Sequence, residues 1–289
     1  MIYSLVILAL SLLSSICLAQ TERPLILHPK VNAPIQQVYS AIIEGVKTVM
    51  PLSDTLVIDD SMPVSQLEAT LNSIQPTKII ALGRMPAEKV AQSRYREQLL
   101  VAGTLFDASE FEGVSLAIDS RVLVSELKTL LPSIKRVFVF GAPTRSSIFV
   151  HPESLIGQPL MISRHHEDPL INTRALWQLL AHEASTTDAI LLPSQLDRDI
   201  LFELVQLAWE KRIILLSTNL AHLKEGVLMV FYPDNAGMGR QIGTLAANPK
   251  AQRYESLTQI QIAVNTSVAT HLRIDITPKD LRCIQLQVK

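Results

Sequence analysis

The sequence predicts an α/β protein built around parallel β-sheets. From Pro24 onward, short apolar runs alternate with longer amphipathic stretches, and this alternation is typical of βα units that form a parallel sheet. The apolar runs are continuous and do not alternate with polar residues, as expected for strands that helices cover on both faces. These two observations predict the fold class.

Eight runs are predicted to be buried strands. They are Leu25–Leu27, Leu56–Ile58, Ile79–Leu82, Leu99–Ala102, Val137–Phe140, Leu160–Ile162, Ala189–Leu192 and Ile213–Leu216. Helices are predicted at Ile35–Val49, Val64–Ser73, Ala87–Tyr95, Val122–Leu131, Thr173–Ala184, Asp199–Lys211 and Met238–Ala247. In one of them Ile200, Leu204 and Leu207 follow helical spacing, which makes one apolar face for packing on a sheet.

Eight strands with crossover connections can close into a barrel, form one wide sheet or divide between two doubly wound lobes. The segment from Phe106 to Asp119 favours two lobes. It carries Asp107, Glu110 and Glu112 before the short apolar run Val114–Ile118. This composition predicts a solvated crossing between two sheets.

The first residues predict export. Ile2–Ala19 is an apolar and small-residue run without a charged side chain, and the polar Gln20–Arg23 follows it. A membrane span needs about 20 apolar residues, so this shorter run is predicted to be a signal peptide that is cleaved after Ala19. An uncleaved anchor is the alternative, because residues 1–4 contain no lysine or arginine. Cys17 follows an isoleucine where a lipoprotein signal has a small residue, so no lipid anchor is expected.

Charge and cysteine content narrow the class of protein. The chain has 26 Lys and Arg against 27 Asp and Glu, and this balance argues against a nucleic-acid partner, which would need a basic face. After removal of the leader, Cys283 is the only cysteine, so no internal disulfide can form. Stability is therefore expected to come from a hydrophobic core.

Catalytic motifs are absent from the sequence. Neither Gly-x-Ser-x-Gly, nor a phosphate-binding Gly-x-x-x-x-Gly-Lys-Ser/Thr, nor Gly-x-Gly-x-x-Gly occurs. His165–Asp168 is the densest polar cluster, but it lacks a partner at a recognisable ligand spacing, so it is interpreted as a solvated loop. We therefore expect no catalytic residue, no metal site and no cofactor, and a protein that is not an enzyme.

The second half carries motifs in a recognisable order. They are Asp188–Pro193, Ile213–Asn219, Lys224–Leu228, Tyr232–Asp234 and Met238–Gln241. In this order they resemble the ABC-transporter substrate-binding family whose better-known members bind aromatic amino acids, a branch of the type I periplasmic binding proteins. The resemblance covers about Leu123 to Thr277, and across Pro24–Ala117 it is architectural. Glycine is scarce and the family's glycine-rich loop near Phe106–Asp119 is missing, so ligand identity is not carried over.

The resemblance implies two Rossmann-like lobes joined by three crossings, with a small molecule held in the cleft between them by hinge closure. It implies an N-terminal lobe of residues 24–118 and 234–256 and a C-terminal lobe of residues 119–233 and 257–289. The implied protein is periplasmic and monomeric and serves an inner-membrane ABC permease. An orphan sensing or accessory protein with a membrane partner is the alternative, and an enzyme with an unrecognised site is a third hypothesis.

Parallel sheets bind ligands at the carboxyl ends of their strands, so the residues after each strand are the candidate ligand contacts. They are His28, Arg84, Phe106, Asp107, Thr144, Ser194, Thr218, Asn219, Tyr232 and Asp234. Phe106 and Tyr232 would offer stacking surfaces, with core packing as the alternative for both.

The polar candidates also have structural alternatives. Arg84 is suited to a ligand carboxylate. Asp234 is expected either to accept a hydrogen bond from a ligand amine or to cap the helix that follows it. Thr144, Ser194 and Thr218 are expected to contact ligand or to cap helices.

Overall fold

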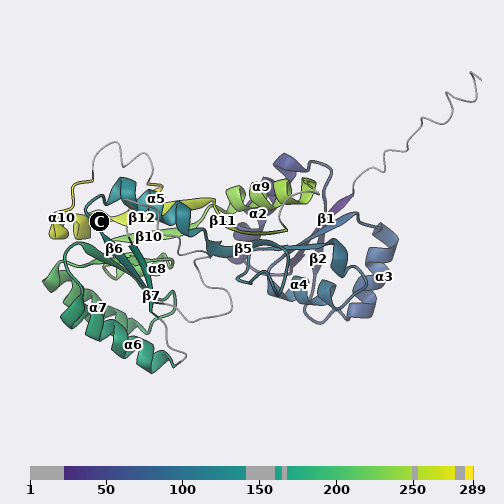
Figure 1. Cartoon of the computed structure of the whole chain (residues 1–289). Helices are drawn as coiled ribbons and strands as arrows, with labels where there is room; N and C mark the ends of the chain where they lie inside the picture. Colours follow the sequence, from purple (N-terminus) through teal and green to yellow (C-terminus); the bar gives the residue numbers. More distant parts are fainter. Residues whose placement is uncertain (1–22, 141–159, 165–167, 249–252, 277–283, 289) are drawn as a thin grey trace, which may run out of the picture.

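The computed structural model describes residues 23–140, 160–164, 168–248, 253–276 and 284–288. These residues form two α/β lobes that lie side by side (Figure 1). Each lobe contains one sheet with helices on both faces, so the predicted fold class of two Rossmann-like lobes is confirmed. No helix within these ranges is long and apolar enough to cross a membrane, and the predicted leader lies outside them.

The first sheet has six strands in the order β11-β5-β4-β3-β1-β2, and its strand pairs are parallel. The strands are β1 (Pro24–Pro29), β2 (Asp54–Ile58), β3 (Lys78–Leu82), β4 (Leu99–Ala102), β5 (Gly113–Ile118) and β11 (Tyr254–Leu257). Its helices are α2 (Ile35–Val49), α3 (Val64–Ile74), α4 (Arg84–Ala91), the 3-10 turn η1 (Arg96–Gln98) and α9 (Asn235–Ala247).

Helices α2 and α9 cover one face of this sheet, and α3 and α4 cover the other (Figure 1). Strand β1 shows why its sequence is apolar throughout. Ile26 packs in the cluster beneath α2 and α9, whereas Leu25 and Leu27 pack beneath α3 and α4. Both faces of the strand are therefore buried, as parallel sheets require.

The second sheet has seven strands in the order β13-β12-β10-β9-β8-β6-β7. The strands are β6 (Arg136–Phe140), β7 (Leu160–Arg164), β8 (Asp188–Leu191), β9 (Ile214–Ser217), β10 (Met229–Pro233), β12 (Ile260–Asn265) and β13 (Leu286–Val288). Only one pairing in this sheet, between β10 and β12, is antiparallel among the described residues.

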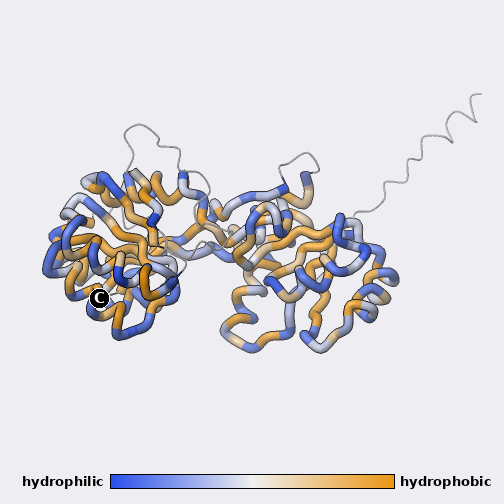
Figure 2. The backbone as a smooth tube through the Cα atoms, turned by 60° about the horizontal axis from the view of Figure 1, so that its bottom comes forward, coloured by the Kyte–Doolittle hydropathy of each residue, from blue (hydrophilic) through white to orange (hydrophobic). Residues whose placement is uncertain are grey.

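Helices cover both faces of the second sheet as well. They are α5 (Ser120–Leu130) and α10 (Thr266–Leu272) on one face, and α6 (Pro169–Gln178), the π-helical turn η2 (Leu179–Glu183), α7 (Arg198–Lys211) and α8 (Ala221–Lys224) on the other. Figure 2 shows the hydrophobic residues along the strands inside each lobe, with hydrophilic residues on the outer helices and loops.

The chain passes between the lobes at three places. These are the steps from Ile118 to Ser120, from Pro233 to Asn235 and from Leu257 to Ile260. A single residue separates the end of β5, and likewise the end of β10, from an element of the other lobe, so both strands must point toward that lobe. The carboxyl edges of the two sheets therefore face each other.

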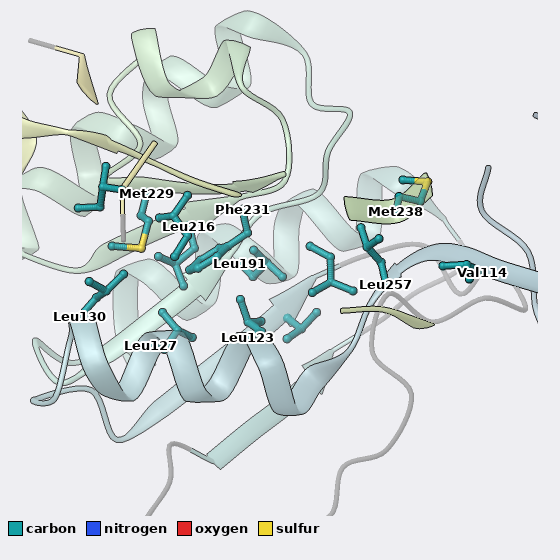
Figure 3. Close-up of a cluster of buried hydrophobic side chains, with 14 of the residues drawn as sticks. Val114, Leu123, Leu127, Leu130, Leu191, Leu216, Met229, Phe231, Met238 and Leu257 are labelled. Carbon is teal, nitrogen blue, oxygen red and sulfur yellow. The ribbon is translucent and has the colours of Figure 1, made fainter. Parts of the chain in front are cut away.

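The three crossings are anchored in a continuous hydrophobic core (Figure 3). One cluster joins Val114, Met238 and Leu257 of the first lobe to Leu123 and Phe231 of the second. These crossings are therefore packed segments. A change in the angle between the lobes must shift the side chains of this cluster.

All eight predicted strands are present, with boundaries that differ by at most two residues, but two other predictions are wrong. Phe106–Asp119 is not a solvated crossing: Gly113–Ile118 forms β5 inside the first sheet, and Phe106 is fully buried. Helix α4 begins at Arg84 and not at Ala87, because Pro86 is tolerated in a first helical turn, where its missing N–H group has no intrahelical partner.

Candidate ligand-binding site at the facing sheet edges

We call the carboxyl edge of each sheet, which faces the other lobe, its facing edge. Ser194 and Asn219 connect the ends of β8 and β9 at the facing edge of the second lobe. Ser194 follows β8 and Asn219 follows β9, and the Asn219 side-chain amide donates to the Ser194 carbonyl oxygen at 2.9 Å. The Asn219 side-chain oxygen accepts from the backbone N–H of Ala221 at 3.0 Å. The loops after β8 and β9 are thus held together, and Thr218, next to Asn219 in the chain, is half-buried.

His222 is a further candidate residue, which the sequence did not predict. It lies in α8 with only 4% of its surface exposed, and its Nδ1 lies 2.8 Å from the hydroxyl of Ser217, the last residue of β9. Burial lowers the pKa of the His222 imidazole below its usual 6.5, and the nearby Glu225 partly opposes this. The ring is therefore neutral near neutral pH.

The alternative of helix capping does not apply to Ser194 or Thr218. Helix α7 is capped by Asp197, whose carboxylate accepts from the backbone N–H of Asp199 at 2.9 Å. In the turn before α8 the corresponding acceptor is the side chain of Asn219. Both Ser194 and Thr218 are consequently left at the sheet edge without a capping role.

Tyr232 and Asp234 lie at the end of β10, where the chain crosses to the first lobe. Asp234 occupies the cap position of α9, but its carboxylate makes no capping hydrogen bond. It lies instead 3.3 Å from the Arg240 guanidinium. Burial raises the pKa of the half-buried Tyr232 phenol, and the negative charge of Asp234 acts in the same direction, so the hydroxyl stays protonated at neutral pH.

His28 and Tyr39 meet at the facing edge of the first lobe. Their ring centroids lie 6.2 Å apart. The Tyr39 hydroxyl lies against Gly83, 2.7 Å from the position that a Gly83 Cβ would take. Gly83, directly after β3, has a φ of +89°, and its lack of a side chain leaves room for the Tyr39 hydroxyl.

Tyr39 is the second functional candidate that the sequence analysis missed, because it lies inside α2 and not after a strand. Burial raises the pKa of its phenol above 10.0, so the hydroxyl is a neutral donor. It makes no hydrogen bond to any part of the chain that the structure describes. A glycine directly after β3 was the available signal, since such a glycine often marks the close approach of another group.

Arg84 is held within its own lobe. Its guanidinium donates to the Leu105 carbonyl oxygen at 3.0 Å and lies 3.5 Å from Glu88 and 3.6 Å from Glu110. The side chain is nevertheless 46% exposed. These contacts leave Arg84 at the facing edge with its charge already balanced by carboxylates.

Phe106 is a core residue, so the prediction that it offers a stacking surface is wrong. Its ring is fully buried and makes edge-to-face contacts with Phe111 and Tyr254, with centroids 5.9 and 5.8 Å apart. The reason is that the chain after β4 folds back over the face of the sheet before it forms β5. Asp107 lies in the turn that follows, where its carboxylate accepts from the backbone N–H and the hydroxyl of Ser109.

Several predictions fall on residues outside the described ranges. They concern Thr144, Cys283, the leader and His165–Glu167 of the polar cluster. The fourth residue of that cluster, Asp168, caps α6 by accepting from the backbone N–H of Leu170 at 2.8 Å. The described residues contain no group of three or more side chains arranged to hold a metal ion.

A pocket of about 390 Å³ lies in the first lobe, away from the facing edges. Its lining includes Leu99 at the start of β4, Glu112 just before β5 and Arg253 just before β11. These residues mark the amino edge of the sheet. The pocket therefore belongs to the opposite end of the lobe from His28 and Tyr39.

No protein-family model and no curated protein sequence matches the chain. Solved structures do match. The ligand-free, open structure of a substrate binding protein with adhesive properties from Clostridium difficile gives a TM-score of 0.59 at 12% identity, covering 92% of this chain and 99% of that chain. This similarity identifies the fold as that of the type I periplasmic binding proteins.

Two further solved structures are similar at lower TM-scores. An ABC domain in complex with L-Trp from Streptococcus pneumonia has a TM-score of 0.49 and 11% identity, covering 93% of this chain and 100% of that chain. A periplasmic ribose ABC transporter from Conexibacter woesei has a TM-score of 0.47 and 13% identity, covering 91% of this chain and 97% of that chain.

Proposed function

We propose that this chain, which has the type I periplasmic binding-protein fold, is an exported solute-binding protein that captures a small molecule between its two lobes. One observation carries the proposal: the carboxyl edges of both sheets face each other, and both present polar side chains. Ligands of open α/β sheets bind at this edge. The chain contributes binding and no catalytic chemistry.

The proposed contacts are mainly neutral groups. Ser194, Thr218, Asn219 and Tyr232 would contact the ligand from the second lobe, His28, Tyr39 and Arg84 from the first, and Asp234 from the crossing between them. The charges of Arg84 and Asp234 are each balanced by a partner in the same lobe. We therefore expect hydrogen bonds from hydroxyl and amide groups, together with contact to the tyrosine rings, to select an amino acid or a small heterocycle.

Capture would occur by rotation of the lobes about the three crossings. The proposed closing units are residues 24–118 with 234–256, and residues 119–233 with 257–289. We expect a monomer in the periplasm, exported by a leader that is cleaved after Ala19, which delivers its ligand to an inner-membrane ABC permease. A permease and an ATPase encoded beside this chain would favour transport, and a histidine kinase or a diguanylate cyclase would favour a sensing role.

A ligand panel with two readouts tests the proposal. Amino acids and small heterocycles are screened for one that raises the melting temperature with increasing concentration, because a ligand at about 100 times its Kd stabilises the folded state by about 2.7 kcal/mol. Small-angle scattering of the same mixture should show a smaller radius of gyration when the lobes close. A panel without any stabilising compound, or a stabilising compound that leaves the radius unchanged, contradicts capture between the lobes.

Tyr39→Phe separates ligand binding from stability. The hydroxyl has no hydrogen-bond partner in the described structure, so its removal should leave the melting temperature unchanged. Ligand affinity, measured by calorimetry, should fall about tenfold, which corresponds to about 1.4 kcal/mol. The matched control is Tyr95→Phe, because the Tyr95 hydroxyl donates to Asn72 at 2.8 Å within the first lobe. The control should lose about 1 kcal/mol of stability and keep its affinity; equal affinities in both variants would remove Tyr39 from the site.

Asp234→Ala tests the cap position at the second crossing. Since the carboxylate makes no capping hydrogen bond and its partner Arg240 is 49% exposed, the substitution should leave the urea midpoint nearly unchanged. Ligand affinity should weaken, because Asp234 is proposed to contact the bound molecule. An unchanged affinity would exclude Asp234 from the contacts.

A further inference from the structure

The side-chain amide of Asn219 has only one orientation that satisfies its backbone partners. The N–H of Ala221 can only donate, so the atom 3.0 Å away must be the side-chain oxygen. The carbonyl of Ser194 can only accept, so the atom 2.9 Å away must be the side-chain nitrogen. This nitrogen is also the atom that lies 3.3 Å from Nε2 of His222.

The orientation of Asn219 fixes the protonation of His222. One amide proton of Asn219 is directed to Ser194, and the other faces the imidazole, so Nε2 must accept a hydrogen bond. The single proton of the neutral ring is then on Nδ1, which donates to the Ser217 hydroxyl at 2.8 Å. The same hydroxyl accepts from the backbone N–H of Asn219 at 3.0 Å. Both ring nitrogens of His222 and the side-chain amide of Asn219 keep these partners only while the ring is neutral.

A second proton on the ring breaks this hydrogen-bond network. The protonated Nε2 would face the N–H of Asn219, so two donors would meet across 3.3 Å, and a charge would be placed where only 4% of the residue is exposed. Asn219 must then turn away, and this movement also removes its hydrogen bond to Ser194. Protonation of one buried ring thus loosens both loops at the facing edge.

The charged surroundings of His222 are sparse. Helix α8 is followed by Glu225, which favours the protonated ring, and Glu225 is paired with Arg198 of α7 at 3.2 Å. Lys224 of α8 is exposed. The strands packed against α8 are β10 and β12, and they carry no charged side chain; Tyr232 is the titratable residue among them. Among the described residues, Glu225 is the carboxylate that favours the imidazolium, and burial outweighs its effect on the pKa of His222.

We infer that His222 is a positioning residue: its neutral Nδ1–H ring holds Asn219 and Ser194 in the arrangement that contacts the ligand, and acidification releases them. The inference rests on the proposed function, because it describes the regulation of the same site. Below pH 6.5 the unfolded chain binds a proton that the folded ring resists. The intact arrangement is therefore fully present above pH 6.5 and is lost as the pH falls through the lower pKa of the folded state.

An NMR titration of the ¹⁵N-labelled full-length protein tests this without a ligand. The His222 ring nitrogens should show the Nδ1–H tautomer at pH 7.5 and a titration midpoint below 6.5. The side-chain amide of Asn219 and the backbone amide of Gln195 should shift with the same midpoint. An Nε2–H tautomer, or Asn219 signals that do not follow the ring, would overturn the inference.

Two variants extend the test. His222→Gln can keep an acceptor at the Nε2 position without titrating, so the Asn219 signals should stay fixed from pH 7.5 to pH 5. His182→Gln is the matched control at an exposed histidine, and the Asn219 titration should persist in it.

Once a ligand is found, its Kd should rise at least tenfold from pH 7.5 to pH 5 in the wild type and change less than twofold in His222→Gln. Equal changes in both proteins would overturn the inference. A failed ligand search contradicts only the proposed function, because the NMR titration needs no ligand.

Discussion

Gly239→Ala is expected to destabilise the first lobe by at least about 3 kcal/mol, because the new methyl group has no space. Gly239 of α9 and Gly45 of α2 face each other where the two helices cross. A Cβ at Gly239 would overlap the carbonyl oxygen of Ile42 and lie 2.9 Å from the Gly45 Cα. Both are backbone atoms of the neighbouring helix, so relief requires the helices to separate. Urea unfolding, followed by circular dichroism, measures the loss.

Gly243→Ala is the matched control, one turn further along α9. Its Cβ would meet the Val49 side chain at 3.2 Å and no backbone atom closer than 3.4 Å. The gain in helix propensity of about 1 kcal/mol should offset this milder crowding, so stability should change little. A loss in Gly239→Ala no larger than that in Gly243→Ala would show that the close backbone contact does not limit the packing.

Asp188→Ala is expected to cost about 3 kcal/mol, because it removes a buried carboxylate that accepts four hydrogen bonds and leaves the backbone N–H of Ser185 without this acceptor. The Asp188 side chain is 1% exposed and binds the Arg136 guanidinium through two hydrogen bonds, of 2.8 and 2.6 Å. It also accepts from the backbone N–H of Ser185 at 2.7 Å and from the Ser185 hydroxyl at 2.8 Å. These contacts join the starts of β6 and β8. Thermal unfolding at pH 7 measures the loss.

The Asp188 contribution should also depend on pH. Burial raises the pKa of this carboxyl, but the hydrogen bonds from Arg136 and Ser185 outweigh burial, and the pKa in the folded state lies below 3.8. The stabilisation is therefore fully present above pH 3.8 and is lost as the pH falls through the folded-state pKa. The wild type and Asp188→Ala should converge in stability at low pH.

Glu183→Gln is the control: it removes the exposed pair with Arg164, and its effect should be small. A parallel response of both variants to pH would contradict the assignment.

The rule that ligands bind at the carboxyl ends of parallel strands placed some candidate residues together and misplaced others. Ser194 and Asn219 come directly after neighbouring strands, so the rule alone places them side by side, and the structure joins them by a hydrogen bond. Phe106 also follows a strand, but the chain turns back over the sheet there and buries it. The rule identifies the edge of the sheet and does not determine which way the next residues fold.

Tyr39 and His222 could not be found by the same rule, because both lie within helices. Tyr39 reaches the facing edge across Gly83, and His222 reaches it through Ser217. Such contacts join elements that the sequence does not place next to each other. They appear only when the helices are packed on their sheets.

The apolar pattern of the sequence established that the chain forms parallel sheets, whereas the division of the strands between two lobes came from the family resemblance. Continuous apolar runs separated by amphipathic helices can be buried only with helices on both faces of a sheet, so local patterning was sufficient. The way in which distant segments meet is visible only in the folded chain: α9 lies against α2 through Gly45 and Gly239, and β11 completes the first sheet. The facing edges depend on these long-range contacts. Close approach of two backbones and burial of single side chains follow from three-dimensional packing, so they leave little trace in the local periodicity of the sequence.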